Sequence, residues 1–151
     1  MVEPGVRVTG PTTTTGLVDR FGRVHTDLRV SLTDRCNLRC SYCLPEEGVP
    51  WLPKDELLTR GELVTVIEIA VERGITEVRL TGGEPLLRPD LVELVGEVAA
   101  LQGTDGPVEV SLTTNGIGLD RRAQQLADAG LARVNISLDT LDPDRFASMT
   151  R

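Results

Sequence analysis

The sequence predicts an α/β protein built on a parallel sheet, with about four strands and three complete crossover helices. Short strand patterns alternate with helical patterns from Asp27 onward, and parallel strands need such crossovers. Each strand pattern alternates strictly between apolar and polar residues, whereas a sheet covered on both faces usually has continuously apolar strands. One face of the sheet should therefore pack against the helices, and the other should be polar.

The polar face of the predicted sheet is unusual in composition. The four strands are predicted at residues 28–32, 78–81, 108–113 and 134–138. Arg29 and Arg79 lie on the polar side together with several hydroxyl side chains, whereas an ordinary solvent-exposed face would be richer in Lys and Glu. We therefore favour a polar cavity lined by this face over an open two-layer sandwich with solvent on the polar side.

Capping residues mark where the predicted helices begin and end. The first helix begins at a capping box of Thr59 and Glu62 and ends at Gly74. A helix N-terminus favours Asp at the cap and Pro at the first helical position. The other predicted boundaries are Asp90 and Glu93 for the second helix, residues 119–129 for the third, and Asp142 with Pro143 for the start of a fourth.

Composition restricts the class of protein. Residues 1–16 lack apolar periodicity and are predicted to form a flexible leader, with residues 17–151 forming one domain. A net charge of −7 disfavours electrostatic binding to nucleic acid or to an anionic membrane surface. No apolar run exceeds four residues, so we expect neither a secretory signal nor a transmembrane helix. These features favour an acidic enzyme of the reducing cytoplasm.

The three cysteines of the chain are Cys36, Cys40 and Cys43. An odd set in a reducing compartment indicates metal-binding or reactive thiols and not a disulfide framework. A structural zinc site needs four ligands, and the single histidine, His25, has no partner nearby at a usual ligand spacing. Three thiolates suit an iron–sulfur cluster in which one iron has no protein ligand. Zinc, and three buried thiols on one helix face, are the alternatives.

Polar motifs follow the ends of the later strands. In TGGEP, Gly82 and Gly83 allow either a tight turn or the close approach of a ligand to the backbone, and Glu84 can accept hydrogen bonds from an ammonium group. LTTNG ends the third strand, and NISLD ends the fourth. In a βα barrel such strand ends converge on the active site. A plain turn at Asn115 and a satisfied hydroxyl at Ser137 are the alternatives.

Together these motifs resemble a known family. CNLRCSYC matches the C-x3-C-x2-C signature of radical S-adenosylmethionine enzymes, and TGGEP matches the family's next motif. With LTTNG and VNISLD, the chain from Gly16 to Arg151 is similar to the GTP 3′,8-cyclases, lyases of molybdenum-cofactor biosynthesis. Members of the family have six βα units, and the cyclases have a second cysteine trio. The resemblance therefore implies a partial (βα) barrel of the radical S-adenosylmethionine type, truncated before the barrel closes.

The resemblance also implies a role for each matched residue. A 4Fe-4S cluster on Cys36, Cys40 and Cys43 would bind S-adenosylmethionine and, once reduced, release a 5′-deoxyadenosyl radical. The expected contacts are Tyr42, Gly83 and Ser137 for S-adenosylmethionine, and Arg29, Arg79 and Thr113 for GTP. Guanidinium groups suit phosphate oxygens. An ion pair of these arginines with Glu109 or Asp139 is the alternative.

The motifs alone do not fix the substrate. A related enzyme acting on a peptide or another small molecule, and a non-catalytic zinc-binding or interaction module, are the alternatives to a cyclase. The expected partners are GTP and an electron donor, with neither nucleic acid nor a membrane, and the sequence is compatible with a homodimer. Because four strands cannot close a barrel, we expect open strand edges and an unshielded cavity, and we do not expect this chain alone to cyclise GTP.

Overall fold

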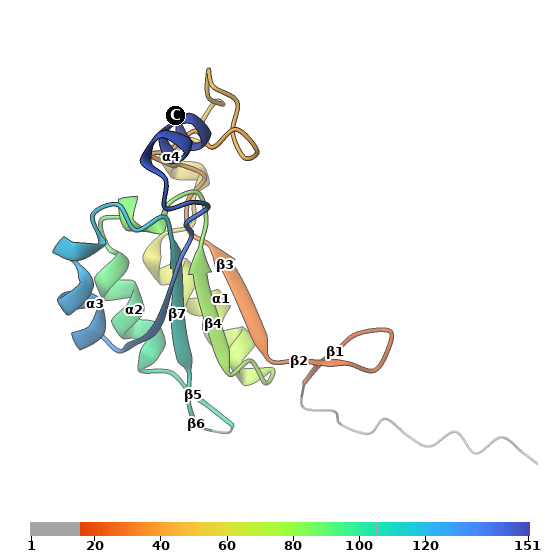
Figure 1. Ribbon diagram of the computed structural model, residues 1–151. Coiled ribbons are helices and arrows are strands. Elements are labelled where there is room, and N and C mark those ends of the chain that lie inside the picture. The colour runs from red at the N-terminus through yellow and green to blue at the C-terminus, as the bar shows by residue number, and fades with distance from the viewer. Residues whose placement is uncertain (1–15, 105) are drawn as a thin grey trace, which may run out of the picture.

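A four-stranded parallel sheet with helices on one face forms the body of the protein (Figure 1). The computed structural model describes residues 16–104 and 106–151. The strands follow the order β3–β4–β7–β8, and the sheet does not close into a barrel, as the sequence predicted. The strands are β3 (Asp27–Ser31), β4 (Glu77–Thr81), β7 (Glu109–Thr114) and β8 (Leu131–Ile136). The helices are α1 (Arg60–Glu72), α2 (Leu91–Ala99), α3 (Ala123–Asp128) and α4 (Pro143–Thr150).

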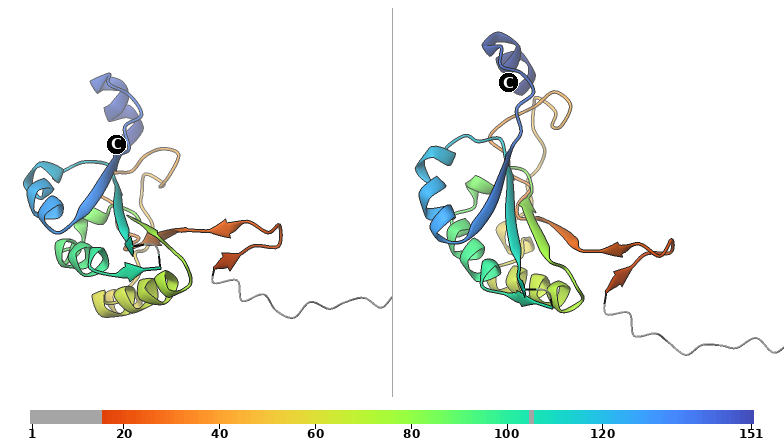
Figure 2. Two further views of the ribbon diagram at one scale, coloured as in Figure 1. Left: turned by 90° about the horizontal axis from the view of Figure 1, so that it is seen from below. Right: turned by 60° about the horizontal axis from the view of Figure 1, so that its bottom comes forward.

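Several short elements were not predicted from the sequence. Four short strands form two antiparallel pairs, and the pair β1–β2 projects away from the sheet (Figure 2). The short strands are β1 (Leu17–Val18), β2 (Val24–His25), β5 (Gln102–Gly103) and β6 (Gly106–Pro107), and the 3-10 helices are η1 (Lys54–Glu56), η2 (Pro85–Leu87) and η3 (Leu119–Arg121). Of the predicted leader, residues 1–15 lie outside the described residues, and β1 begins directly after Gly16. None of the helices in the described part of the chain has the length and apolarity needed to cross a membrane.

The hydrophobic core lies between the sheet and helices α1, α2 and α3. Helix α1 buries Leu63, Ile67 and Val71, whose spacing of four residues lines one face of a helix. The remaining core residues are mostly branched aliphatic side chains of the facing layers: Val78, Leu80, Val110 and Leu112 on strands, and Leu91, Leu94, Val95, Val98 and Leu126 on helices. The predicted division into an apolar face under helices and a polar face opposite them therefore applies to β4 and to most of β7.

Strand β8 departs from that prediction. Val134 is 37% exposed and Ile136 is 58% exposed, although both lie on the apolar side of the strand. Their Cα partners on β7 are the buried residues Leu112 and Thr114. The reason is that β8 is the last strand of the sheet. Helix α4, which follows β8, does not cover this strand but turns toward the loop that carries the cysteines (Figure 1).

The ends of α1 and α4 follow local sequence rules. The Thr59 hydroxyl accepts a hydrogen bond from the Glu62 amide at 3.3 Å, and the Glu62 carboxylate accepts from the Thr59 amide at 2.8 Å. The capping box is thus confirmed. The Asp142 carboxylate accepts from the Arg145 amide at 2.9 Å, which confirms the predicted start of α4.

Two other predicted helix features are confirmed only in part. Helix α2 begins directly after Asp90, as predicted. Asp90 does not cap α2 with its side chain, because its carboxylate pairs with Arg88 at 2.7 Å. The third helix does not run unbroken over residues 119–129. It divides into η3 and α3 at Arg122, whose φ of −119° departs from the value of about −63° typical of an α-helix.

Candidate functional site

The candidate site lies at the carboxyl ends of the parallel strands, where the loops after them meet. The cysteine loop, defined here as residues 34–44, follows β3 and carries all three thiols. The Asn115 side-chain amide donates to the Asn37 side-chain oxygen at 2.8 Å, and the Tyr42 hydroxyl donates to the Asp139 carboxylate at 2.7 Å. The cysteine loop is therefore tied to the segments that follow β7 and β8.

The three cysteines are free thiols on this one loop. Cys36 and Cys40 are half-buried, and Cys43 is exposed. The Leu38 amide donates to the Cys36 sulfur at 3.5 Å, a contact of the kind that tunes sulfur ligands of iron–sulfur centres. Within residues 16–104 and 106–151, no three His, Cys, Asp or Glu side chains gather around a single point as ligands of one metal ion. A cluster differs from a single ion because each thiolate binds its own iron, so three free thiols on one loop fit a cluster.

The double glycine after β4 packs against the start of the cysteine loop. A Cβ atom on Gly82 would lie 2.5 Å from the Thr33 carbonyl oxygen, and one on Gly83 would overlap the Arg35 carbonyl. The Gly83 amide donates to the Thr33 carbonyl at 2.6 Å. Both positions therefore need glycine because the chain's own backbone approaches them. This close packing fixes Gly83, which the sequence predicts as an S-adenosylmethionine contact, against Arg35, the residue before Cys36.

Glu84 connects the turn after β4 to the end of β7. Its side chain is 1% exposed and accepts hydrogen bonds from the Leu86 amide at 2.9 Å, the Thr114 hydroxyl at 2.7 Å and the Asn115 amide at 2.8 Å. A buried carboxylate needs such donors. The expectation that Glu84 receives the ammonium group of a ligand is not supported, because both carboxylate oxygens bind groups of the chain itself.

Arg29 and Arg79 lie side by side on the polar face. They are Cα partners on β3 and β4, and with Asp27 and Leu28 they line a hollow of about 330 Å³. The Nε atom of Arg79 is buried and has no hydrogen-bond partner among the described residues. Neither Arg29 nor Arg79 forms a salt bridge with another described residue.

A third arginine on the same face behaves differently. Arg133 pairs with Glu77 at 3.2 Å and with Glu109 at 3.3 Å. Asp139 is engaged by Tyr42. The alternative in which Arg29 or Arg79 pairs with Glu109 or Asp139 is therefore wrong for the described residues, where Glu109 pairs with Arg133 and Asp139 accepts from Tyr42.

The other predicted site residues lie near the same end of the sheet. Tyr42 is 66% exposed, and its hydrogen bond to Asp139 raises the pKa of the phenol above its ordinary value. The Ser137 amide donates to the Thr114 carbonyl at 2.8 Å, which fixes Ser137 just beyond β8. Thr113 is half-buried on the polar face of β7, with Asn135 of β8 as its Cα partner.

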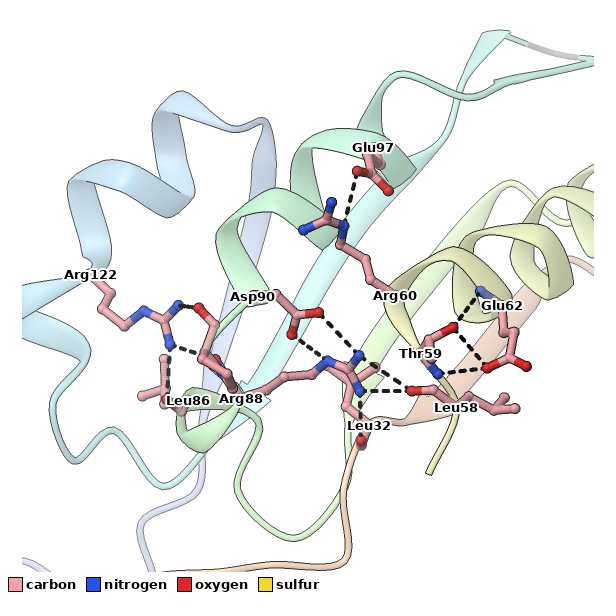
Figure 3. A network of polar contacts seen from close by, with 11 residues as sticks. Leu32, Leu58, Thr59, Arg60, Glu62, Leu86, Arg88, Asp90, Glu97 and Arg122 are labelled. Carbon is pink, nitrogen blue, oxygen red and sulfur yellow. Dashed lines mark hydrogen bonds and ion pairs between the residues drawn. The ribbon is translucent and has the colours of Figure 1, made fainter. Parts of the chain in front are cut away.

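Sequence reasoning missed the arginines that hold the turn after TGGEP (Figure 3). Arg88 donates to the Leu32 carbonyl at 3.2 Å and to the Leu58 carbonyl at 3.3 Å. Arg122 donates to the Leu86 and Arg88 carbonyls, both at 2.9 Å. The sequence signal that could have indicated the role of Arg88 is the aspartate two residues later, Asp90, with which it pairs. A cavity of about 610 Å³ beside this network includes none of the predicted site residues.

Comparisons with known proteins assign the chain to a family. The Radical SAM superfamily model matches residues 30–151, and the chain belongs to this superfamily. GTP 3′,8-cyclase of Streptomyces coelicolor is 64% identical over 136 residues, which cover 89% of this chain and 39% of that protein. GTP 3′,8-cyclase 2 of Mycobacterium tuberculosis is 61% identical over 147 residues, 97% of this chain and 39% of that protein. The chain thus spans less than half the length of these relatives.

Solved structures support the fold. SuiB of Streptococcus suis bound to S-adenosylmethionine matches with a TM-score of 0.62 at 20% identity, over 82% of this chain and 27% of that chain. BtrN in complex with AdoMet and 2-DOIA matches with a TM-score of 0.56 at 19% identity, over 84% of this chain and 51% of that chain. Radical SAM proteins use a 4Fe-4S cluster and S-adenosylmethionine. Membership of this superfamily favours the cluster over the zinc and plain-thiol alternatives.

Proposed function

We propose that this chain carries the cluster site, the S-adenosylmethionine site and part of the GTP site of a radical S-adenosylmethionine GTP 3′,8-cyclase. The proposed reaction is the first step of molybdenum-cofactor biosynthesis, which converts GTP to 3′,8-cyclo-7,8-dihydro-GTP. The high identity to relatives with the name GTP 3′,8-cyclase supports this assignment. In the proposal, residues 17–151 act as one domain.

The observation that carries the proposal is the pair of arginines at 29 and 79, neither of which forms a salt bridge with any residue that the structure describes. Arg79 has a buried Nε without a partner, and Arg29 lies beside it in the same hollow. Arg79 is half-buried, and an arginine Nε that is buried without an acceptor among the described residues favours an anionic ligand, because planar guanidinium groups suit phosphate oxygens. The cysteine loop lies at the end of the same strand as Arg29. A nucleotide bound there by its phosphates would have its nucleoside within reach of that loop.

Each predicted residue has a defined task in this proposal. The thiols of Cys36, Cys40 and Cys43 hold the cluster, while Tyr42, Gly83 and Ser137 position S-adenosylmethionine. Arg29, Arg79 and Thr113 bind and orient GTP. When both cofactors are bound, they supply a carbon-centred radical, and the chain's part is to hold the groups in place and exclude water.

The proposal can be tested on the purified chain without air. Reconstitution with iron and sulfide should give a coloured protein, followed by visible absorption, EPR, and iron and sulfide analysis. Equilibrium dialysis then compares the affinity for GTP of the wild type with that of Arg79→Gln. The affinity of the variant for GTP should be lower by roughly tenfold or more, the factor expected for the loss of one charged hydrogen bond. Arg73→Gln is the matched control, because it removes the same charge at an exposed position at the end of α1.

The outcomes separate the alternatives. A colourless protein with stoichiometric zinc would favour the zinc-binding module. A normal cluster together with unchanged GTP affinity in Arg79→Gln would point to a related enzyme that acts on a peptide or another small molecule. Tenfold weaker binding in Arg73→Gln as well would mean that GTP responds only to net charge.

The surroundings of the enzyme complete the proposal. Because a reductant must deliver electrons to the cluster, we include an electron donor among the proposed partners. Free thiols and a net charge of −7 favour the reducing cytoplasm and disfavour nucleic acid and anionic membranes as partners. A homodimer is the proposed assembly, and the exposed strand β8 is where association can be tested.

A further inference from the structure

The cysteine loop is held from outside by a segment far away in sequence. The Arg39 amide donates to the Thr150 carbonyl at 2.8 Å, and the Ser41 amide donates to the Met149 carbonyl at 2.9 Å. These carbonyls belong to the last turn of α4, which lies over the loop (Figure 1). The last carbonyls of a helix have no partner within the helix, so the loop amides satisfy them.

The two amides flank the middle cysteine. Arg39 and Ser41 are the neighbours of Cys40, so the backbone on both sides of that thiol is fixed to α4. The Cys40 carbonyl in turn accepts from the Cys43 amide at 2.8 Å. One continuous set of hydrogen bonds therefore runs from the end of α4 through Cys40 to Cys43.

A side-chain contact reinforces the same connection. The hydroxyl of Tyr42, which lies between Cys40 and Cys43, donates to the Asp139 carboxylate at 2.7 Å. A hydrogen bond to an ionised acceptor is stronger than a neutral one. At the far end of this segment, Thr150 is 5% exposed, and its hydroxyl donates to the Phe146 carbonyl at 2.9 Å, so the final turn of α4 is packed and internally bonded.

We propose that Asp139, Met149 and Thr150 form a clamp, here called the α4 clamp, that positions Cys40 and Cys43 to hold the cluster. The inference rests on the proposed function, since it concerns the cluster site. Asp139 is a positioning residue that acts through Tyr42. The clamp limits how far the thiols move apart and thereby slows release of the cluster.

The first test measures cluster loss in the absence of S-adenosylmethionine, so that any contact of Tyr42 with that cofactor is irrelevant. The reconstituted full chain is mixed anaerobically with an iron chelator, and the decay of visible absorbance is followed. Asp139→Ala and Tyr42→Phe should each lose the cluster about three- to tenfold faster than the wild type, the factor that one hydrogen bond corresponds to. The double variant should be no faster than either single one, because both remove the same contact. Asp139→Asn keeps an acceptor and should restore most of the wild-type rate.

Two comparisons distinguish positioning from general destabilisation. Asp144→Ala removes an exposed carboxylate from the first turn of α4 and should leave the rate of cluster loss unchanged. The urea midpoint of each metal-free variant is measured alongside. Faster cluster loss with an unchanged midpoint supports the clamp, whereas cluster loss that follows the midpoint contradicts it.

A second test needs no cluster. In the metal-free chain, the amides of Arg39 and Ser41 should be protected from hydrogen exchange. The protection factor at both amides should be at least threefold lower in Asp139→Ala, about the effect of one hydrogen bond. If the wild type takes up no cluster, the proposed function is wrong, and the exchange data still decide whether the clamp contacts exist. If the wild type takes up a cluster and Asp139→Ala releases it at the same rate, the clamp is wrong and the proposed function stands.

Discussion

The Thr114 hydroxyl donates a hydrogen bond of 2.7 Å to the buried carboxylate of Glu84 and so joins the ends of strands β7 and β4. The same carboxylate accepts from the Asn115 and Leu86 amides. The turn after β4 and the end of β7 thus meet at one side chain. The arrangement gives Glu84 a structural task that is separate from any ligand.

Glu84→Gln should destabilise the metal-free chain. The substitution keeps the shape but places an amide donor where an acceptor is needed, and a buried hydrogen bond to a charged group contributes about 1.5–3 kcal/mol. We expect a loss of about 2 kcal/mol in the free energy of unfolding, measured by urea titration with circular dichroism. Glu68→Gln on the exposed side of α1 is the control and should change little. Equal stability of the two variants would contradict the structural task of Glu84.

Gly83→Ala tests the close approach between the turn after β4 and the cysteine loop. The new Cβ would overlap the Arg35 carbonyl, and overpacking of this kind costs about 1–3 kcal/mol. Gly61→Ala is the matched control, because a Cβ there meets nothing within 4 Å, and alanine favours a helix by up to about 1 kcal/mol. Thermal unfolding without cofactors should therefore show a lower Tm only for Gly83→Ala. A normal Tm for Gly83→Ala would show that the two backbones can separate without cost.

The capping box of α1 predicts a dependence of stability on pH. Hydrogen bonds from the Thr59 amide and hydroxyl lower the pKa of Glu62 below its ordinary value of 4.5. The folded state therefore binds the proton of Glu62 less readily than the unfolded state does. The stabilisation is present above the ordinary pKa and is lost as the pH falls through the lowered one. The difference in unfolding free energy between the wild type and Glu62→Gln should accordingly shrink in acid.

Glu68→Gln serves as the control for this pH experiment as well. Its difference from the wild type should show no comparable dependence over the same range. A difference between the wild type and Glu62→Gln that stays constant from neutral to acidic pH would contradict the capping-box explanation.

The exposed apolar side of β8 should promote self-association. Ile136 is 58% exposed on a strand that has a neighbour on one side only among the described residues, and such edges pair readily with other chains. Sedimentation velocity over a range of concentrations should show association of the wild type and less of it for Ile136→Lys. Ile69→Lys is the matched control, because Ile69 is 51% exposed on α1 and away from the sheet edge. Identical behaviour of both variants would mean that β8 is not the contact.

The parts of the fold that depend on neighbouring residues were predictable from sequence. The capping box of Thr59 and Glu62 and the cap at Asp142 need only three or four residues, and the structure confirms them. Strict alternation also indicated a polar face with Arg29 and Arg79 on it. Their direct adjacency is a consequence of pairing β3 with β4 in register.

The parts that depend on distant partners were not predictable. Asp90 is well placed to cap α2, but its carboxylate pairs with Arg88, which the distant Leu32 and Leu58 carbonyls hold in place. The exposure of Ile136 depends on the path of the chain after β8, which no local pattern specifies. The same holds for the contact of Arg39 with Thr150, because a backbone hydrogen bond outside helices and sheets leaves no periodic pattern in the side chains.

The connection between Tyr42 and Asp139 also has a consequence for biosynthesis on the ribosome. The two residues are 97 positions apart, and a ribosome that adds about 5–20 residues per second needs roughly 5–20 seconds to make the intervening chain. During that delay the thiols are already synthesised but lack the partner that immobilises their loop. A cluster loaded after this interval would meet an ordered loop, whereas oxidants that act before it would meet thiols without that contact.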